Sequence, residues 1–140
     1  MTEADRPRAV LFLCDRNTIR SPMAAALLAH LDGGARAESA GIVPGESDPL
    51  SQAVLDEIGL AVMAPPRAVE AVRLGRFDLI VALSPQAQHQ ALELTRNLPA
   101  AVEFWQVADP SLAHGSREQR LATYRMVRDD LLRKLKERFL

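Results

Sequence analysis

Short apolar runs alternate with segments of helical periodicity along this chain. The runs RAVLFL at 8–13 and FDLIVAL at 77–83 are nearly continuous in apolar residues, as the buried strands of a parallel sheet are. Further strands are predicted at 35–39 and 101–107. Apolar spacing together with Ser, Pro and Gly signals predicts helices over 22–32, 49–59, 67–74, 84–97 and 116–140.

The ends of two predicted helices carry clear residue signals. Ser21 suits the N-cap of the first helix, Pro22 suits its first position, and Gly33-Gly34 suits its end. Ser84-Pro85 repeats the same start for the helix over 84–97. The last helix is predicted to be amphipathic, with apolar residues at helical spacing at Leu121, Tyr124, Val127, Leu131, Leu135 and Phe139.

The predicted elements follow the order βαβααβαβα. Strands that alternate with helices in this way form a parallel sheet with helices on both faces. We therefore predict an α/β fold, a three-layer sandwich around a four-stranded parallel sheet, in a single domain over 1–140. Ligands of such folds bind at the carboxyl ends of the strands, and both Cys14 and Asp109 follow predicted strands.

The composition narrows the function classes. The formal net charge is −1 and the sequence pI is near 6.3, which argues against nucleic acid or an anionic membrane as the main partner. One cysteine among 140 residues excludes an internal disulfide and a zinc site built on paired cysteines. No signal peptide and no membrane span are predicted, so we expect a cytoplasmic protein that uses neither metal nor cofactor.

The loop from Cys14 to Ser21 has the features of an anion site. A loop between a strand and a helix N-terminus can turn its backbone N–H groups inward, and the helix end adds positive potential. Arg20 supplies a planar fork that suits a phosphate-like anion. The same field favours the thiolate of Cys14, a nucleophile to which the Ser21 hydroxyl could donate. A lone cysteine at a strand end is otherwise most often a small buried apolar residue.

The stretch VLFLCDRNTIRSP at 10–22 resembles the signature of the low-molecular-weight protein tyrosine phosphatases and of the arsenate reductases that share their fold. ESAG at 38–41, FDLIVAL at 77–83 and ADP at 108–110 are similar to further motifs of that family, and the resemblance covers the whole chain. It implies a phosphate-binding loop after the first strand and a reaction through a phosphocysteine intermediate.

The resemblance also implies a role for each site residue. Cys14 would be the nucleophile, Arg20 would bind the phosphoryl oxygens, and Asp109 would be the general acid and then the general base. Ser21 would stabilise the thiolate, and Asn17 would hold the loop in shape, since asparagine tolerates left-handed dihedrals. The substrate-binding loop would consist of Asp15, Arg16, Asn17, Thr18, Ile19 and Ser21. Asp109 could otherwise be a simple Asp-Pro turn.

The sequence departs from the family pattern at several positions. Arg16 replaces a glycine and is expected to pair with Asp15 or to contact substrate, and Ile19 replaces a second loop cysteine. The segment MAPPRAVEA holds no histidine to support Asn17. The stretches SLAHG and IVPGESDPL lack the aromatic residues that family phosphatases place around the cleft, whereas Trp105 and Tyr124 are expected in the core. The histidines His30, His89 and His114 show no metal-ligand spacing.

Three functions therefore stay open. The first is a phosphomonoesterase, with protein phosphotyrosine as the expected substrate class. The second is an arsenate reductase that depends on an external small thiol, because the thioredoxin-coupled reductases of the family use further cysteines. The third is a catalytically weak module that binds phosphate or phosphopeptides. The expected partner is a phosphorylated protein or a small phosphomonoester, and the expected assembly is a monomer or weak dimer.

Overall fold

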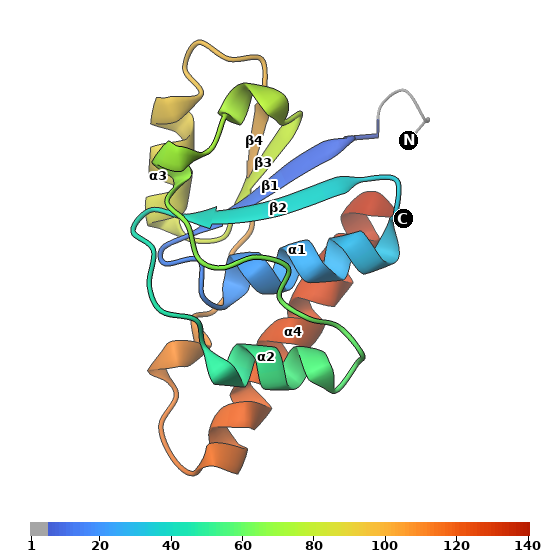
Figure 1. Ribbon diagram of the computed structural model, residues 1–140, viewed down its shortest axis with the longest axis vertical. Helices are drawn as coiled ribbons and strands as arrows, with labels where there is room; N and C mark the ends of the chain where they lie inside the picture. Colours follow the sequence, from blue (N-terminus) through green and yellow to red (C-terminus); the bar gives the residue numbers. More distant parts are fainter. Residues whose placement is uncertain (1–5) are drawn as a thin grey trace.

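A parallel sheet forms the centre of the computed structural model, which describes residues 6–140 (Figure 1). Its strand order is β2-β1-β3-β4, and all neighbouring pairs are parallel. The strands are β1 (Ala9–Cys14), β2 (Arg36–Gly41), β3 (Leu79–Ala82) and β4 (Ala101–Phe104). The α-helices are α1 (Arg20–Leu31), α2 (Pro49–Asp56), α3 (Pro85–Leu94) and α4 (Arg117–Phe139). The four-stranded parallel sheet confirms the predicted fold class.

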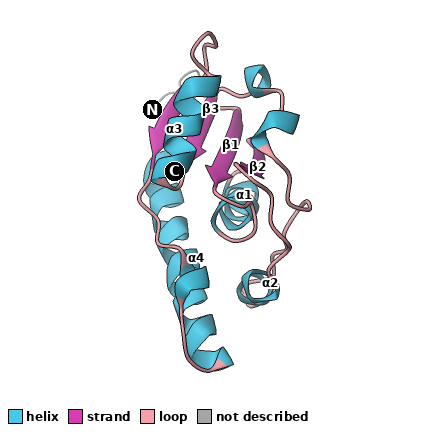
Figure 2. Ribbon diagram, turned by 90° about the vertical axis from the view of Figure 1, so that its left-hand side faces the viewer, coloured by secondary structure: helices cyan, strands magenta, loops and turns pink. Residues whose placement is uncertain are grey.

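Helices cover both faces of the sheet, as predicted (Figure 2). All six residues of β1 are buried, and they alternate between two cores because successive side chains of a strand point to opposite faces. Val10, Phe12 and Cys14 belong to the larger core, which contains residues of α1, α2 and α4. Leu11 and Leu13 belong to the smaller core, which contains residues of α3. The strand is therefore apolar throughout because neither face meets water.

The predicted helix over 67–74 is wrong. Two short 3₁₀ turns, Val69–Ala71 and Leu74–Arg76, occupy this region. The backbone of Arg67 accepts a hydrogen bond from the N–H of Gly41, and Ala68 forms an isolated parallel bridge with Gly41. The segment runs beside the end of β2 as extended chain, and this pairing excludes a helix that begins at Arg67.

The N-cap predicted for the first helix is also wrong. Helix α1 begins at Arg20 with Ile19 at its N-cap position, so Ser21 lies inside the helix. The Ser21 hydroxyl contacts Cys14, Asn17 and Ala40 instead of a free N–H of the helix. By contrast, Ser84 does cap α3, accepting a hydrogen bond from the N–H of Ala87. The two Ser-Pro pairs thus serve different purposes.

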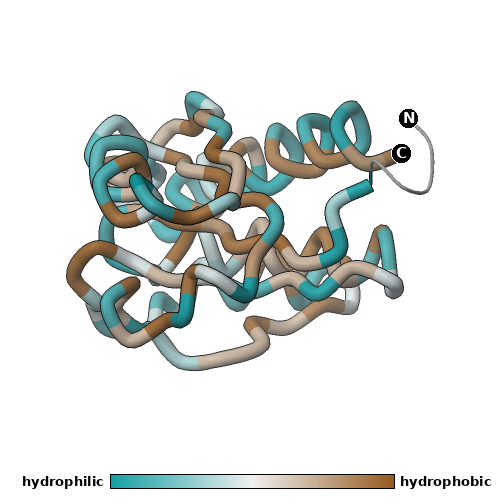
Figure 3. Tube along the Cα trace, turned by 90° about the horizontal axis from the view of Figure 1, so that it is seen from above, coloured by the Kyte–Doolittle hydropathy of each residue, from teal (hydrophilic) through white to brown (hydrophobic). Residues whose placement is uncertain are grey.

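The long helix α4 is amphipathic, and its N-terminal part is tied to α2. Figure 3 shows polar residues along one side of the helix that ends at the C-terminus and apolar residues along the other. A capping box of Ser116 and Gln119 starts the helix. Arg125 and Arg128 both bind the Glu57 carboxylate after α2, and the hydrogen bonds from Arg125 are the main cause of the lowered pKa of Glu57. Within the described residues, no helix is long and apolar enough to cross a membrane.

Candidate active site

The backbone of the loop after β1 turns its carbonyl groups away from the loop centre. The carbonyls of Cys14, Asp15 and Arg16 accept hydrogen bonds of 2.9–3.1 Å from the N–H groups of Ile42, Val43 and Gly45. In a planar trans peptide the carbonyl and the following N–H point in opposite directions. The N–H groups of residues 15, 16 and 17 therefore point into the loop, and that of Asn17 donates to Cys14 Sγ at 3.3 Å. This is the geometry of an anion-binding nest.

The Cys14 thiol lies at the base of this loop, as the last residue of β1. The residue is 3% exposed, and its Sγ lies 2.9 Å from the Ser21 hydroxyl oxygen. That oxygen accepts a hydrogen bond of 2.8 Å from the Asn17 side-chain amide. The Ser21 O–H is therefore free to point at the sulfur or at the Ala40 carbonyl, 3.2 Å away. A thiolate at Cys14 would receive two donors, the Ser21 hydroxyl and the Asn17 N–H.

Asn17 fixes the shape of the loop from its centre. Its backbone has a φ of 58°, the left-handed region that asparagine tolerates better than other non-glycine residues. Its side-chain amide also donates to the Ser39 hydroxyl at 2.9 Å, and its side-chain oxygen accepts the N–H of Arg67 at 3.0 Å. Ser39 and the Arg67 main chain therefore support Asn17 in the absence of a histidine. Sequence reasoning missed both supports, although Ser39 lies in the ESAG motif.

Gly41 lets the loop pass close to the end of β2. A Cβ atom at this position would lie 2.7 Å from both the carbonyl carbon of Arg16 and the backbone nitrogen of Asn17. Real Cβ atoms essentially never come so close to backbone, so a side chain here would push the loop outward. The glycine of the ESAG motif is thus required by the path of the loop after β1.

Arg20 is anchored beneath the loop and is 7% exposed. Its Nη1 donates to the carbonyls of Val107 at 3.1 Å and Leu83 at 3.4 Å, which follow β4 and β3. Its Nη2 lies 3.4 Å from Asp15 Oδ2 and 4.0 Å from Asp109 Oδ2. The guanidinium is therefore held in place through one nitrogen and presents the other to the site, which suits the binding of a tetrahedral oxyanion.

Asp109 is fixed by its own turn, with one oxygen left toward Arg20. Its Oδ1 accepts hydrogen bonds from the Ser111 N–H at 3.0 Å and the Ser111 hydroxyl at 2.7 Å. Its Oδ2 lies nearest to Arg20. Asp109 therefore forms an Asp-Pro turn and also lines the cavity beside Arg20. The interpretation as a simple turn and the interpretation as a site residue do not exclude each other. Sequence reasoning missed Ser111, although this position directly follows the ADP motif.

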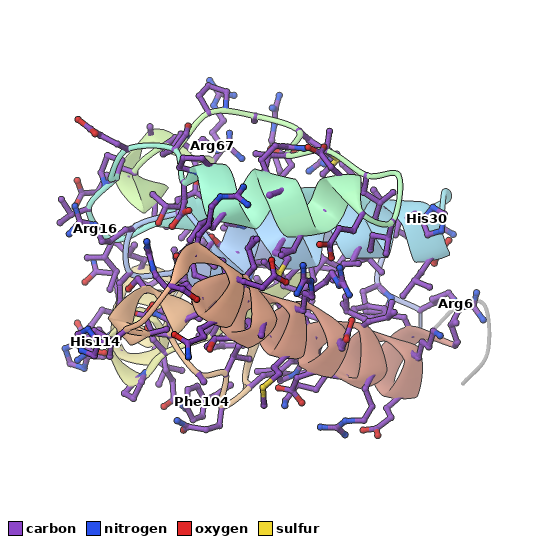
Figure 4. The ribbon with its side chains drawn as sticks, turned by 90° about the horizontal axis from the view of Figure 1, so that it is seen from below. Arg6, Arg16, His30, Arg67, Phe104 and His114 are labelled. Carbon is purple, nitrogen blue, oxygen red and sulfur yellow. The ribbon has the colours of Figure 1, made fainter. Side chains whose placement is uncertain are left out.

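Asp15 does not form the expected ion pair with Arg16. Its carboxylate accepts a hydrogen bond of 2.5 Å from the Ser84 hydroxyl and pairs with Arg20. Ser84 is the N-cap of α3, so Asp15 links the loop after β1 to the junction between β3 and α3. Ser84 is 69 residues away in the chain, so the sequence did not indicate this partner of the Asp15 carboxylate. Arg16 is exposed, lies against Gly45, and projects at the same end of the molecule as His114 (Figure 4).

These side chains surround a cavity of about 200 Å³, named here the catalytic cavity. It is lined by Cys14, Asp15, Arg16, Thr18, Ile19, Arg20, Asp48, Asp109 and Ser111. The structure thus brings together most of the residues expected from sequence, while Asn17 and Ser21 lie behind the cavity wall. Ile19 is 5% exposed and belongs mainly to the larger core.

Asp48 is a cavity residue that sequence reasoning missed. Its Oδ1 caps α2 by accepting the N–H of Leu50 at 2.8 Å, and its Oδ2 accepts the Tyr124 hydroxyl at 2.7 Å. Burial, followed by this hydrogen bond to a carboxylate, raises the pKa of Tyr124 above its ordinary value. Asp48 is followed by Pro49, as Asp109 is followed by Pro110. This repeated Asp-Pro dipeptide is the one sequence feature that could have pointed to Asp48.

The remaining candidates do not line the catalytic cavity. Tyr124 is fully buried, and Trp105 packs edge to face on Phe12 with ring centroids 6.1 Å apart. His30 and His114 lie at opposite ends of the molecule (Figure 4). Over residues 6–140, no group of three or more His, Cys, Asp or Glu side chains could hold a metal ion.

Comparisons with known proteins identify a family and a fold for this chain. The family model described as low molecular weight phosphotyrosine protein phosphatase matches residues 9–139. An arsenate reductase from Archaeoglobus fulgidus is 31% identical, with a TM-score of 0.74 over 91% of this chain and 96% of that one. The tyrosine phosphatase amsI of Erwinia amylovora is 16% identical, with a TM-score of 0.78 over 98% of this chain and 94% of that one. The YwlE arginine phosphatase of Geobacillus stearothermophilus is 24% identical, with a TM-score of 0.78 over 93% of this chain and 89% of that one.

Proposed function

Since this chain belongs to the low molecular weight phosphotyrosine protein phosphatase family, we propose that it hydrolyses phosphomonoesters through a phosphocysteine intermediate, with phosphotyrosine in proteins as the first substrate class. One observation carries the proposal. Cys14 Sγ receives the Asn17 N–H and lies 2.9 Å from the Ser21 hydroxyl, within a cavity that Arg20 and Asp109 also line. We place the reaction in the cytoplasm, where a reducing environment keeps the single thiol reduced.

The first half of the reaction forms the intermediate. The Cys14 thiolate attacks phosphorus, an S–P bond forms, and the bond between phosphorus and the ester oxygen breaks. Asp109 Oδ2 gives its proton to that oxygen, so the leaving group departs neutral. Arg20 and the inward N–H groups bind the three remaining phosphoryl oxygens, whose charge is spread in the transition state. The Ser111 hydroxyl holds the opposite oxygen of Asp109 during this transfer.

The second half releases phosphate. The Asp109 carboxylate takes a proton from water, and the water oxygen attacks phosphorus on the side the leaving group has vacated. The S–P bond breaks, inorganic phosphate leaves, and Cys14 returns to the thiolate. The donors from Ser21 and Asn17 stabilise that thiolate, which makes the sulfur a better leaving group in this step.

Phosphoarginine in proteins is a second candidate substrate class. The lining of the catalytic cavity includes the three carboxylates Asp15, Asp48 and Asp109, and, over the described residues, it includes no aromatic side chain. A phosphotyrosine ring would lose stacking contacts of about 0.5–1.5 kcal/mol each in such a cavity. A guanidinium leaving group would instead be attracted by the carboxylates that line the cavity. The ratio of kcat/KM for a phosphoarginine peptide and a phosphotyrosine peptide of the same sequence separates the two classes.

The deciding experiment is a phosphatase assay with a small aryl phosphate, in a chelator and over a range of pH. We expect wild-type turnover with a bell-shaped pH profile, no turnover by Cys14→Ser, and slower turnover by Asp109→Asn. Wild-type activity in Cys14→Ser would overturn the mechanism. Phosphate binding by calorimetry without any turnover would point to a binding module.

A parallel assay tests arsenate reduction. The single cysteine means that a second thiol has to come from outside the chain. Arsenite formation that requires a small thiol such as glutathione, in the absence of phosphate ester turnover, would favour the reductase. We expect the reverse pattern.

A further inference from the structure

An apolar groove adjoins the catalytic cavity. It has a volume of about 540 Å³. Its apolar lining residues are Pro22, Pro49, Val62, Met63, Ala64, Pro65 and Pro66, and its polar lining residues are Asn17, Thr18, Ser47, Asp48 and Gln52. We call it the Met63 groove. Thr18 and Asp48 line both the groove and the catalytic cavity, so these two side chains form the divide between them. In Figure 1 the chain that follows α2 runs across α1, and this segment forms the outer wall.

The groove is preformed by contacts that the catalytic cavity does not use. The Gln52 side chain accepts the N–H of Val62 at 2.9 Å and donates to Asp56 at 2.6 Å, which fixes the start of the outer wall. Pro65 and Pro66 restrict the chain further because their rings fix φ. A groove held open in this way does not have to be ordered by its ligand, which favours binding.

The lining defines the chemistry of the occupant. None of the seven apolar lining residues carries a charge, and among the described residues Asp48 is the one charged residue that lines the groove. The prolines have no N–H with which an added strand could pair. Met63 is 52% exposed, and its flexible thioether adapts to side chains of different shape. Asp48 already accepts hydrogen bonds from the Leu50 N–H and the Tyr124 hydroxyl, so the apolar residues set the preference of the groove. The groove therefore favours an apolar side chain over a charged group or an extended backbone.

The position of the groove identifies the occupant further. A phosphorylated residue in the catalytic cavity would place its own backbone at the mouth, beside Thr18 and Asp48. Each neighbouring residue extends the chain by about 3.3 Å, so residues within three positions reach about 10 Å along the surface, past Thr18 and Asp48. We propose that the Met63 groove is a subsite for an apolar side chain of the phosphorylated protein, within three residues of the phosphorylated position; this inference rests on the proposed function.

The test uses phosphotyrosine peptides with an alanine host sequence in which one leucine is moved from position −3 to +3. We expect one position at which leucine raises kcat/KM about tenfold or more, the gain typical of burying such a side chain. Met63→Ser and Ala64→Arg should reduce that preference to near one, while turnover of a small aryl phosphate stays unchanged. Met126→Ser on α4 is the matched control, because Met126 is also exposed and lines neither cavity.

The outcomes separate this inference from the proposed function. If wild type hydrolyses the aryl phosphate but shows no leucine preference, or if the preference survives in both groove variants, the subsite is refuted and the phosphatase stands. If wild type does not hydrolyse the aryl phosphate, the Kd values of the same peptides for Cys14→Ser are measured instead. Tighter binding of the peptide with leucine at one position would support the subsite, and equal Kd values would refute it. A dimer in sedimentation that Ala64→Arg abolishes would show that a second copy covers the groove, which would also overturn the proposal.

Discussion

The side-chain amide of Asn17 donates to the hydroxyl of Ser39 at 2.9 Å, which links the centre of the loop after β1 to β2. The same Asn17 has a φ of 58° and also contacts Ser21 and the Arg67 main chain. One residue thus combines an unusual backbone conformation with three side-chain hydrogen bonds. The two contributions can be separated by mutation.

Asn17→Gly keeps the left-handed backbone and removes the side-chain hydrogen bonds, whereas Asn17→Ala removes the hydrogen bonds and adds backbone strain. We expect Asn17→Ala to be less stable than Asn17→Gly by about 1 kcal/mol in denaturant unfolding. Ser39→Ala should cost about 1 kcal/mol by itself, since it removes one partner of a partly buried amide. Equal stability of the two Asn17 variants would contradict the role of the backbone.

Gly41→Ala should disrupt the loop while the rest of the sheet persists. Its Cβ would lie 2.7 Å from the backbone of Arg16 and Asn17, so the loop has to move. We expect kcat/KM for an aryl phosphate to fall at least about 100-fold, because displaced donors no longer match the phosphoryl oxygens. Gly75→Ala is the control: a Cβ atom there meets nothing within 4 Å and the residue does not line the cavity, so near wild-type activity is expected. A fully active Gly41→Ala would show that the loop does not need its present path.

Ser111→Ala should weaken proton donation by Asp109. The variant removes the hydroxyl that holds Asp109 Oδ1 at 2.7 Å. We expect kcat for phenyl phosphate, which has a poor leaving group, to fall about tenfold, and kcat for para-nitrophenyl phosphate to fall much less. Ser116→Ala serves as control, since it removes the N-cap of α4 and costs about 1 kcal/mol of stability without contact to Asp109. Equal losses on both substrates would rule out a role in positioning the acid.

Tyr124→Phe should change how stability depends on alkaline pH. The pKa of Tyr124 is raised by burial and by Asp48, so above pH 10 the unfolded chain loses this proton more readily than the folded one. The free energy of unfolding therefore falls as pH rises through the unfolded pKa. Tyr124 is the single tyrosine, so Tyr124→Phe should make the decline above pH 10 less steep. At pH 7 it should cost about 1.5–3 kcal/mol, the loss of a hydrogen bond to a charged group.

Thermal unfolding from pH 7 to pH 11, with wild type and Tyr124→Phe side by side, measures both effects. Lysine and arginine titrations are shared by the two proteins and cancel in the difference. An identical decline in both would show that Tyr124 does not contribute to alkaline unfolding.

The sequence alone determined the order of the four strands and the four α-helices, and it placed Cys14 and Arg20 on either side of one loop. The buried strands 8–13 and 77–83 are apolar on both faces, and that local pattern indicates a parallel sheet whatever the partners are. The spacing from Cys14 to Arg20 lies within one strand–loop–helix unit, so its geometry is local as well. The prediction of a helix over 67–74 was wrong for the opposite reason. The conformation of this segment depends on the pairing of Ala68 with Gly41, which is distant in the chain.

Only the tertiary structure decided which groups support the site. Ser39 and the Arg67 main chain hold Asn17, Ser84 takes the carboxylate of Asp15, and Tyr124 meets Asp48. Each of these contacts joins segments more than 20 residues apart, so no local pattern encodes it. A serine such as Ser21 reads as a helix cap in sequence because capping is its commonest local role. Ser21 instead lies inside α1, where its hydroxyl contacts Cys14 Sγ and accepts the Asn17 amide, because the fold places these groups beside the first turn of the helix.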